Sequence, residues 1–339
     1  VSFSAPLIEV CAFCYQSRSA IRVLLVLGQK KASDLVLGAS SLAEKIDFSP
    51  WLNKETTFAC RCAIPDLGQE IAMTVGGHIN DVTNAPVDLD NPAITVIIHE
   101  TDGEIIIGLD LGGDELGKRD YRIFLGNESL RGTIAYGLLA FAGFDGSQTM
   151  ADVFCRSGII PIEAALLAGG LSVHRHVRDF PFRKLKPLLE VDWDATLDRI
   201  DKKTLRAPKG LIVAMDETFG AVAAAQKNAK IAGVNTLMEF SRTDLQFLDA
   251  KFGKGGLDII VTMPPQQSAK INGAALEKAH HDLFYQAEFI LKKKGKLAII
   301  TKCNVDGLKK YATEFKFMQV KEASFWQGGL QLTVLVFVK

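Results

Sequence analysis

From Gln148 to the end of the chain, strand-like apolar runs alternate strictly with segments of helical periodicity. The run "LDIIVTM", residues 257–263, is typical: its β-branched residues suit a strand that is buried on both faces. Because parallel neighbours need a crossover connection, this order predicts an α/β fold with a doubly wound parallel sheet. The last two strands turn at Gly328-Gly329, a connection so short that they must pair antiparallel.

The region before about residue 120 follows a different pattern, with strands and helices of an α+β fold. We predict a strand at Ile21–Gly28, a helix at Ser33–Ile46 with Ser33 or Asp34 as its cap, and a second strand in "TTFACRCAI". Residues 93–111 are expected to form a hairpin that turns at Thr101-Asp102-Gly103. The abrupt start at Val1 suggests that an element preceding this region lies outside the sequence. The predicted domains are therefore 1–120 and 121–339.

Composition narrows the class of protein. Lysine and arginine number 39 and so do aspartate and glutamate, so contact with nucleic acid would need a local basic patch. No apolar stretch reaches the ~18 residues of a membrane span and no signal peptide is visible, which predicts a soluble cytoplasmic protein. Cys11 and Cys14 form a CxxC and Cys60 and Cys62 a CxC, but their patterns fit small buried residues better than a zinc site. No metal site is predicted.

Polar residues follow four of the predicted strands where each strand ends. Asp152 precedes the short loop Cys155–Gly158 and a helix, an arrangement that lets backbone amides approach a polar ligand. Asp216 ends the next strand, where a nucleotide ribose would lie, and Asp244 ends the third. The fourth strand ends at Met263-Pro264-Pro265-Gln266, whose prolines cannot continue a ladder. Together these strand ends predict a nucleotide-type site at one edge of the sheet.

These segments resemble RNA methyltransferases that carry a THUMP domain. "YRIFLGNESLRGTIAYGLLAFAGF" resembles the family's lead-in helix, and "DVFCRSGIIPIEAAL" its Asp-Pro-x-Cys-Gly-Ser-Gly-Thr loop. "PVDLDNPAITVIIHE" and "SRSAIRVLLVLG" resemble the THUMP domain and the ferredoxin-like segment before it. The resemblance implies a class I methyltransferase fold behind an RNA-binding region, with S-adenosylmethionine as cofactor. The cofactor positions that it implies are Asp152, Cys155, Ser157, Gly158, Asp216 and Asp244, with Leu130 to Thr133 flanking the methionine end.

Two positions depart from the family pattern. The family has Asn-Pro-Pro-Tyr at the fourth strand end, where the asparagine and the first proline carbonyl accept hydrogen bonds from the target amine and the aromatic ring stacks on the base. Here these positions are Met263, Pro264, Pro265 and Gln266, and a thioether is only a weak acceptor. Arg156 replaces a loop glycine, so we expect a backbone angle that glycine favours. Its side chain either points away or fills the site.

A basic segment lies in the insertion at about residues 171–209. "HRHVRDFPFRKLKP" interleaves positive residues with Phe180 and Phe182, a composition that suits phosphate contact and base stacking. The alternative is an amphipathic segment that packs its phenylalanines on the core. The candidate RNA-binding residues are Arg175, Arg178, Arg183, Lys184 and Lys186. The lysines of Leu291–Lys296 are instead interpreted as charges at a helix C-terminus.

Two functions stay open. The first is an S-adenosylmethionine-dependent RNA methyltransferase that acts on a base amino group in tRNA or rRNA, with Pro264, Pro265 and Gln266 at the acceptor. The second is a methyltransferase-like protein that no longer transfers methyl and holds RNA or pairs with an active protein subunit. Met263 and Arg156 favour the second function because amine methylation of this kind relies on alignment. A DNA amino methyltransferase also uses two prolines here, but the THUMP-like hairpin favours RNA.

Overall fold

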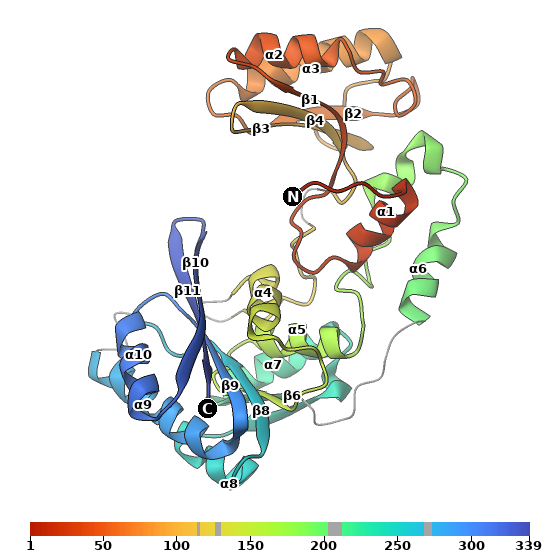
Figure 1. The fold of residues 1–339 in the computed structure, drawn as a ribbon. Coiled ribbons are helices and arrows are strands. Elements are labelled where there is room, and N and C mark those ends of the chain that lie inside the picture. The colour runs from red at the N-terminus through yellow and green to blue at the C-terminus, as the bar shows by residue number, and fades with distance from the viewer. Residues whose placement is uncertain (114–115, 126–129, 203–211, 268–272) are drawn as a thin grey trace. The chain divides into compact units, whose positions relative to one another are not determined.

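The computed structural model describes residues 1–113, 116–125, 130–202, 212–267 and 273–339. They form two compact units (Figure 1): residues 1–117 with 174–202, and residues 118–173 with 203–339. The segment 174–202 belongs to the first unit, although the predicted domain division placed it with the residues after 121. None of the helices among the described residues combines the length and apolar character that a bilayer span needs.

The first unit is built on a four-stranded sheet in the order β1-β4-β3-β2. Strands β3 and β4 form the predicted hairpin, with Thr101 opposite Glu104 and with positive φ at Asp102 and Gly103. The side chain of Asp34 accepts a hydrogen bond from Leu37 N and caps α2, as expected. Its elements are α1 (Leu7–Gln16), β1 (Leu24–Lys31), α2 (Leu35–Ala43), β2 (Phe58–Cys62), α3 (Gly68–Thr83), β3 (Ile94–Thr101), β4 (Glu104–Asp110), η1 (Pro181–Lys184), η2 (Lys186–Leu188) and α6 (Trp193–Lys202).

The basic insertion packs into the core of this first unit. Phe180 and Phe182 are buried and stack with ring centroids 5.1 Å apart, and Trp193 lies 4.6 Å from Phe182. Tyr15 of α1 meets the edge of Phe180 at 6.1 Å. The alternative in which the segment packs on the core therefore holds for both phenylalanines. Burying large aromatic rings stabilises the fold more than leaving them in solvent.

The second unit contains a seven-stranded sheet in the order β10-β11-β9-β8-β5-β6-β7. Five strands are parallel and β11 pairs antiparallel with both β9 and β10, so the predicted parallel sheet with a terminal hairpin is confirmed. The elements are α4 (Gly132–Ala142), β5 (Met150–Asp152), α5 (Ile159–Ala168), β6 (Ile212–Asp216), α7 (Phe219–Ile231), η3 (Asn235–Leu237), β7 (Met238–Arg242), η4 (Leu245–Phe247), α8 (Leu248–Phe252), β8 (Leu257–Thr262), α9 (Gly273–Ile290), β9 (Leu291–Thr301), α10 (Val305–Glu314), β10 (Met318–Gln327) and β11 (Leu330–Val338).

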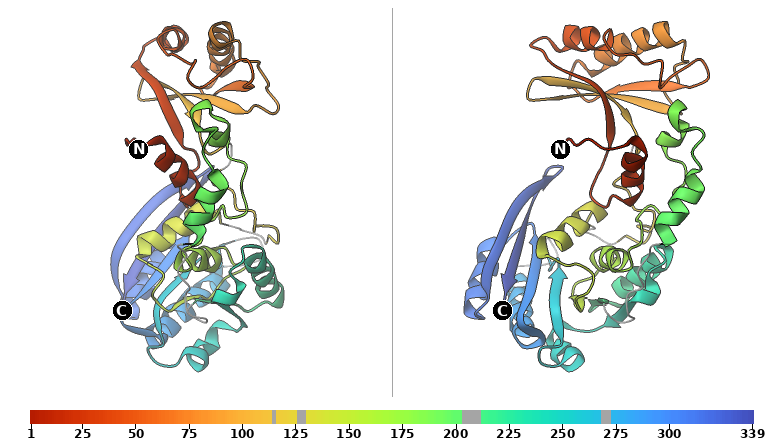
Figure 2. Two further views of the ribbon diagram at one scale, coloured as in Figure 1. Left: turned by 90° about the vertical axis from the view of Figure 1, so that its right-hand side faces the viewer. Right: turned by 45° about the vertical axis from the view of Figure 1, so that its right-hand side comes forward.

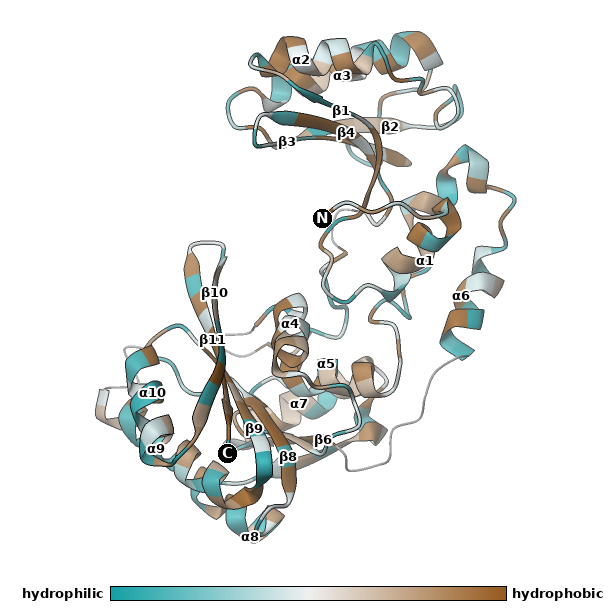
Figure 3. Cartoon of the chain, viewed as in Figure 1, coloured by the Kyte–Doolittle hydropathy of each residue, from teal (hydrophilic) through white to brown (hydrophobic). Residues whose placement is uncertain are grey.

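Helices cover both faces of this sheet. Residues of α4, α5 and α7 form one core on one face, and residues of α9 and α10 form another on the opposite face, as two further views show (Figure 2). Along β5, Met150 belongs to the first core and Ala151 to the second. Strands β6 and β8 are accordingly mainly hydrophobic (Figure 3), as a sheet buried on both faces requires.

One local prediction was wrong. The lysines between Leu291 and Lys296 were expected at the end of a helix, but α9 ends at Ile290 and β9 begins at Leu291. Lys292 forms an ion pair with Asp258 on β8 at 2.7 Å, and Lys296 donates to Ala142 O at 2.9 Å. Leu291 pairs with Leu257 of β8, and the pairing resumes at Lys296 opposite Ile259, so the lysines between them lie at an irregularity of the strand.

Three cysteines are core residues of the first unit, whereas Cys62, which was also expected to be buried, is half-buried. Cys11 and Cys14 lie on α1 with no exposed surface, and Cys60 is buried in β2, as expected. Burial raises the pKa of the Cys11 and Cys60 thiols to about 12, so both are neutral near pH 7. Among the described residues, no group of three His, Cys, Asp or Glu side chains is arranged to hold a metal ion.

Candidate functional site

The order in which the strands are added to the second sheet reverses at β5. From β5 it continues to β6 and β7 on one side, and it returns to β8 and β9 on the other. Ligands of open α/β sheets bind outside the carboxyl ends of the strands at such a switch point. Asp152 ends β5, Asp216 ends β6, and the loop of Met263 follows β8, so the predicted strand ends meet at this edge.

The loop after β5 is a tight turn that delivers the chain into α5. Cys155 N donates to Met215 O at 2.8 Å, and Gly158 N donates back to Cys155 O at 2.7 Å. Gly158 has φ 85°, and a Cβ there would lie 2.8 Å from the Cβ of Ala225 on α7. Glycine is therefore required at 158 both by backbone angle and by the close approach of α7.

Arg156 takes the left-handed angle that was expected of a glycine position. Its φ is 48°, which costs on the order of 1 kcal/mol for a residue with a Cβ. Its backbone N donates to Asp216 Oδ2 at 3.1 Å, and its Nη2 donates to Pro264 O at 3.0 Å. Of the two alternatives for this side chain, the structure has the one in which it extends into the site.

Asp216 joins the second strand end to this loop. It is 8% exposed, and besides Arg156 N it accepts bonds from the N and Oγ1 of Thr218, at 3.0 and 2.8 Å. The carboxylate is thus fixed at the end of β6 by three donors. This is the position at which a carboxylate meets ribose hydroxyls in folds of this kind.

Asp152 joins the first strand end to the fourth. Its Oδ1 accepts a bond from Thr262 Oγ1 at 2.6 Å and one from Phe154 N at 3.2 Å. The side chain is 1% exposed, and its burial raises the pKa to about 7 although both hydrogen bonds lower it. Asp152 therefore changes its charge in the neutral pH range.

The carbonyl of Pro264 is occupied from within the chain. Arg156 Nη2 donates to it at 3.0 Å, and Gln266 Nε2 donates to it at 2.6 Å. A carbonyl oxygen has two lone pairs, so these two donors use its full capacity. A substrate amine can bond to this oxygen only if one of them withdraws.

Gln266 is held firmly in this arrangement. The residue is 1% exposed, and its Oε1 accepts from Lys302 N at 2.7 Å and from Thr301 Oγ1 at 3.1 Å. Its amide therefore connects the two-proline loop to the end of β9. Gln266 points into the protein, where it has no face to offer a base.

A small open pocket lies at this edge of the sheet. Its lining includes Leu130, Asp152, Arg156, Ser157 and Met263, so it brings the predicted cofactor loop together with the acceptor loop. The Arg156 side chain occupies part of the space between the two loops.

Four predicted cofactor residues lie outside this pocket lining: Gly158, Asp216, Asp244 and Thr133. Asp244 is exposed and caps η4 by accepting a bond from Gln246 N at 3.0 Å. Thr133 is half-buried in the first turn of α4. The predicted roles of all the site residues stay predictions, because positions alone do not test them.

Sequence reasoning missed a buried ion pair beside the pocket. Glu163 on α5 accepts from Arg119 Nε at 2.6 Å and from the Tyr121 hydroxyl at 2.7 Å, with no exposed surface on the Arg119 and Glu163 side chains. A Cβ on Gly132, at the start of α4, would lie 2.6 Å from Arg119 Cγ. A single charge within the apolar run "IIPIEAALLA" was the available signal, since a buried charge needs a partner.

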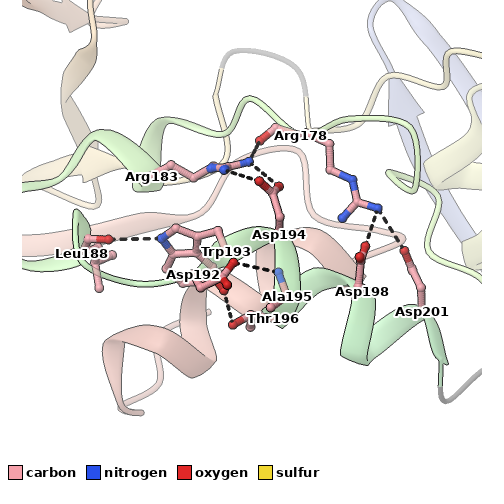
Figure 4. A network of polar contacts seen from close by, with 10 residues as sticks. All are labelled: Arg178, Arg183, Leu188, Asp192, Trp193, Asp194, Ala195, Thr196, Asp198 and Asp201. Atoms are coloured by element: carbon pink, nitrogen blue, oxygen red, sulfur yellow. Dashed lines mark hydrogen bonds and ion pairs between the residues drawn. The ribbon is translucent and has the colours of Figure 1, made fainter.

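Acidic side chains of the same unit pair with three of the five predicted RNA-binding residues, and Figure 4 shows the pairs of Arg178 and Arg183. Arg178 pairs with Asp198 at 3.1 Å and with Asp201 at 3.5 Å. Arg183 makes a two-pronged contact with Asp194, at 3.1 and 3.2 Å.

The other three candidates differ in exposure. Lys184 lies 3.3 Å from Asp179, Arg175 is half-buried, and Lys186 is exposed. The basic run is therefore also the internal charge partner of α6, and its net positive field is weaker than its sequence suggests.

The parallel sheet with its antiparallel hairpin, the glycine turn after β5 and the strand-end carboxylates define the class of S-adenosylmethionine-dependent class I methyltransferases. The chain belongs to the RMKL-like methyltransferase domain family, whose sequence profile matches residues 119–333.

Two curated relatives and one solved structure illustrate the similarity. The tRNA (guanine(6)-N2)-methyltransferase of Methanocaldococcus jannaschii is 27% identical over 98% of this chain and 90% of its own length. The protein of that name from Archaeoglobus fulgidus is 26% identical over 74% of this chain and 59% of its own length. The crystal structure of TrmN from Thermus thermophilus superimposes with a TM-score of 0.74 at 22% identity, covering 100% of this chain and 88% of the other.

Proposed function

We propose that this chain is an S-adenosylmethionine-dependent RNA methyltransferase that acts on a base amino group in tRNA or rRNA. The observation that carries the proposal is the match to a tRNA guanine methyltransferase along 98% of the chain, which includes both units. A relationship confined to the methyltransferase sheet would support the chemistry but not the RNA, because the same sheet serves many substrates.

The residues at the sheet edge fit the proposed cofactor. Asp216 would hold the ribose hydroxyls, the Ser157-Gly158 turn would face the amino acid part, and Asp152 would lie beside it. Asp244 would serve the adenine amine, and Thr133 would flank the methionine end. When bound, the cofactor supplies a methyl group activated by its sulfonium. The chain's own contribution is to hold the reacting atoms in line.

The proposed acceptor step requires a local rearrangement. The target amine would donate to Pro264 O, which in the structure accepts from Arg156 and Gln266. Gln266 is anchored at β9 by two further bonds, whereas Arg156 reaches the carbonyl with a long side chain from a loop. Arg156 is therefore the group that would withdraw.

Calorimetric titration of the purified chain with S-adenosylmethionine tests the cofactor site. Micromolar binding that disappears in Asp216→Ala is the expected result. Transfer of a radiolabelled methyl group from the cofactor to tRNA or rRNA fragments then tests the reaction. Cofactor binding without methyl transfer to any RNA would contradict the proposed methyltransferase activity. It would favour a protein that binds RNA but does not transfer methyl.

A second function is favoured by the occupied carbonyl of Pro264 together with Met263. In this alternative the chain binds RNA, alone or with an active protein subunit, and does not transfer methyl. Met263 is 4% exposed and lines the pocket where the family has an asparagine, so the structure offers the amine no second strong acceptor at that position. Gel-shift binding of tRNA with no methyl transfer would support this function.

The proposed RNA-binding front end is residues 1–120, with the insertion residues Arg175, Arg178, Arg183, Lys184 and Lys186. Lys186 is the sharpest test because it is exposed, whereas Arg183 also anchors α6 through Asp194. Lys186→Ala should weaken RNA binding and reduce its salt dependence without lowering the melting temperature. Unchanged RNA affinity in Lys186→Ala and Arg175→Ala would place the RNA elsewhere.

A further inference from the structure

Asn228 on α7 has no exposed surface, and its side-chain amide is hydrogen-bonded on both sides. Its Nδ2 donates to Phe124 O and to Ser157 O, each at 2.9 Å, and its Oδ1 accepts from Phe124 N at 3.0 Å. Both amide protons and the amide oxygen are thus used. Ser157 lies 71 residues before Asn228 and Phe124 lies 104 residues before it.

The bond to Ser157 acts on the peptide that connects Ser157 to Gly158. The carbonyl of that peptide faces Asn228, while the N–H of the same peptide bonds to Cys155 O at 2.7 Å. Ala225, one helical turn before Asn228, lies directly under Gly158. Helix α7 therefore fixes the orientation of this peptide through Asn228, and through Ala225 it limits how closely the turn approaches the helix.

The two bonds to Phe124 connect the segment before α4, which contains Tyr121 and Phe124 and is called the lead-in segment, to the same Asn228 side chain. Phe124 offers both its N and its O to Asn228, as neighbouring residues of a ladder do, and Lys227 lies 4.9 Å from its ring centroid. The same lead-in segment is anchored a second time, where the Tyr121 hydroxyl donates to Glu163 on α5. Asn228 is thus the shared anchor of the lead-in segment and the turn after β5.

We propose that Asn228 is a positioning residue for cofactor binding, which acts by fixing the peptide plane between Ser157 and Gly158. This inference rests on the proposed function, because it takes the turn after β5 to be a cofactor contact. Without the Asn228 amide, the Ser157 carbonyl loses its buried donor and the peptide is free to rotate toward the pocket. If this peptide turned its carbonyl oxygen toward the pocket, it would displace the backbone face that we expect the ligand to contact. The ligand would then bind less tightly.

The test compares Asn228→Ala with Gln286→Ala. Gln286 is a matched control because it is also a buried amide of the second unit whose side chain bonds to backbone, with Nε2 donating to Gln246 O at 2.9 Å and Oε1 accepting from Asp249 N at 3.1 Å. Its partners Gln246 and Asp249 belong to η4 and α8 and not to the turn after β5. S-adenosylhomocysteine is the probe, and both its dissociation constant and the melting temperature are measured for each variant.

Both variants should melt at lower temperature than the wild type. Asn228→Ala should weaken S-adenosylhomocysteine binding at least tenfold at a temperature where it is fully folded, and Gln286→Ala should change it less than twofold. Equal affinity in wild type and Asn228→Ala would overturn the inference, as would equal weakening in the two variants. If Asn228→Ala does not fold, Asn228→Ser, which keeps a small donor, is measured in its place. Failure of the wild type to bind the probe would overturn the proposed function, and this inference with it.

Discussion

The candidate site has two halves, one that we propose holds the cofactor and one that we propose holds the acceptor amine, and their structures differ. In the half that we propose holds the cofactor, Asp152, Asp216 and the turn at Gly158 meet at one edge of the sheet, and Asp216 is held by three donors. In the acceptor half, Met263 stands for an asparagine and Pro264 O is occupied by Arg156 and Gln266. The cofactor half depends largely on backbone geometry, which the fold maintains. The acceptor half depends on particular side chains, which single substitutions remove.

Restoring the acceptor half should have the largest effect. The double variant Arg156→Gly with Met263→Asn frees Pro264 O of one donor and supplies a second acceptor for the amine. We expect its rate of methyl transfer to RNA to exceed that of the wild type by about 100-fold or more, because misalignment by ~1 Å costs about that much. Radiolabel transfer to tRNA measures the difference. Equal rates in both proteins would show that the acceptor half is intact as it stands.

Removing Asp216 should have the next largest effect, on the cofactor half. Asp216→Ala deletes a carboxylate that the fold holds rigidly at the end of β6, and hydrogen bonds to charged groups contribute about 1.5–3 kcal/mol. We expect S-adenosylmethionine affinity to fall by roughly 10- to 100-fold in calorimetry. Asp194→Ala, in the first unit, is the control and should leave the affinity unchanged. An unaltered affinity in Asp216→Ala would place the cofactor elsewhere.

Asp152 predicts a pH effect of intermediate size. Its pKa is raised to about 7 in the folded protein, against about 3.9 when unfolded, so the folded state holds the extra proton between these values. The free energy of unfolding should therefore fall as pH rises from about 4 to about 7. Asp152→Asn keeps the acceptor oxygen and should not show this fall, so its melting temperature should exceed that of the wild type at pH 8 but not at pH 4. Parallel melting curves across this range would contradict the buried, protonated state.

Asp244 should have the smallest effect. It is exposed and its side chain caps η4, so Asp244→Ala should cost about 1 kcal/mol of cap energy and lower cofactor affinity by less than about tenfold. Calorimetry of this variant beside Asp216→Ala separates the two strand ends. A loss as large as that in Asp216→Ala would mean that the third strand end contributes as much as the second.

Much of the local structure followed from short-range rules. The alternation of strands and helices, the hairpin at residues 93–111, the cap at Asp34 and the left-handed angle of Arg156 were all expected and are all present. Each depends on a few neighbouring residues: the period of the apolar positions, a side chain that reaches the next turn, or a backbone angle that a tight turn imposes. The sequence by itself therefore determined the class of fold and the edge of the sheet at which its polar groups gather.

Contacts between distant segments were decided by the tertiary structure. Arg156 meets Pro264 across 108 residues, Asn228 meets Ser157 across 71, and the phenylalanines of the insertion are buried against α1 and α6. The direction of a long side chain such as Arg156 depends on which acceptors packing brings within reach. The residues next to it in the sequence do not identify these acceptors. For the same reason, composition suggested an open basic patch at 174–186, whereas carboxylates of α6 pair with Arg178 and Arg183. These long-range pairings occupy the carbonyl of Pro264, whereas Asp152, Asp216 and the turn at Gly158 still meet at the edge of the sheet.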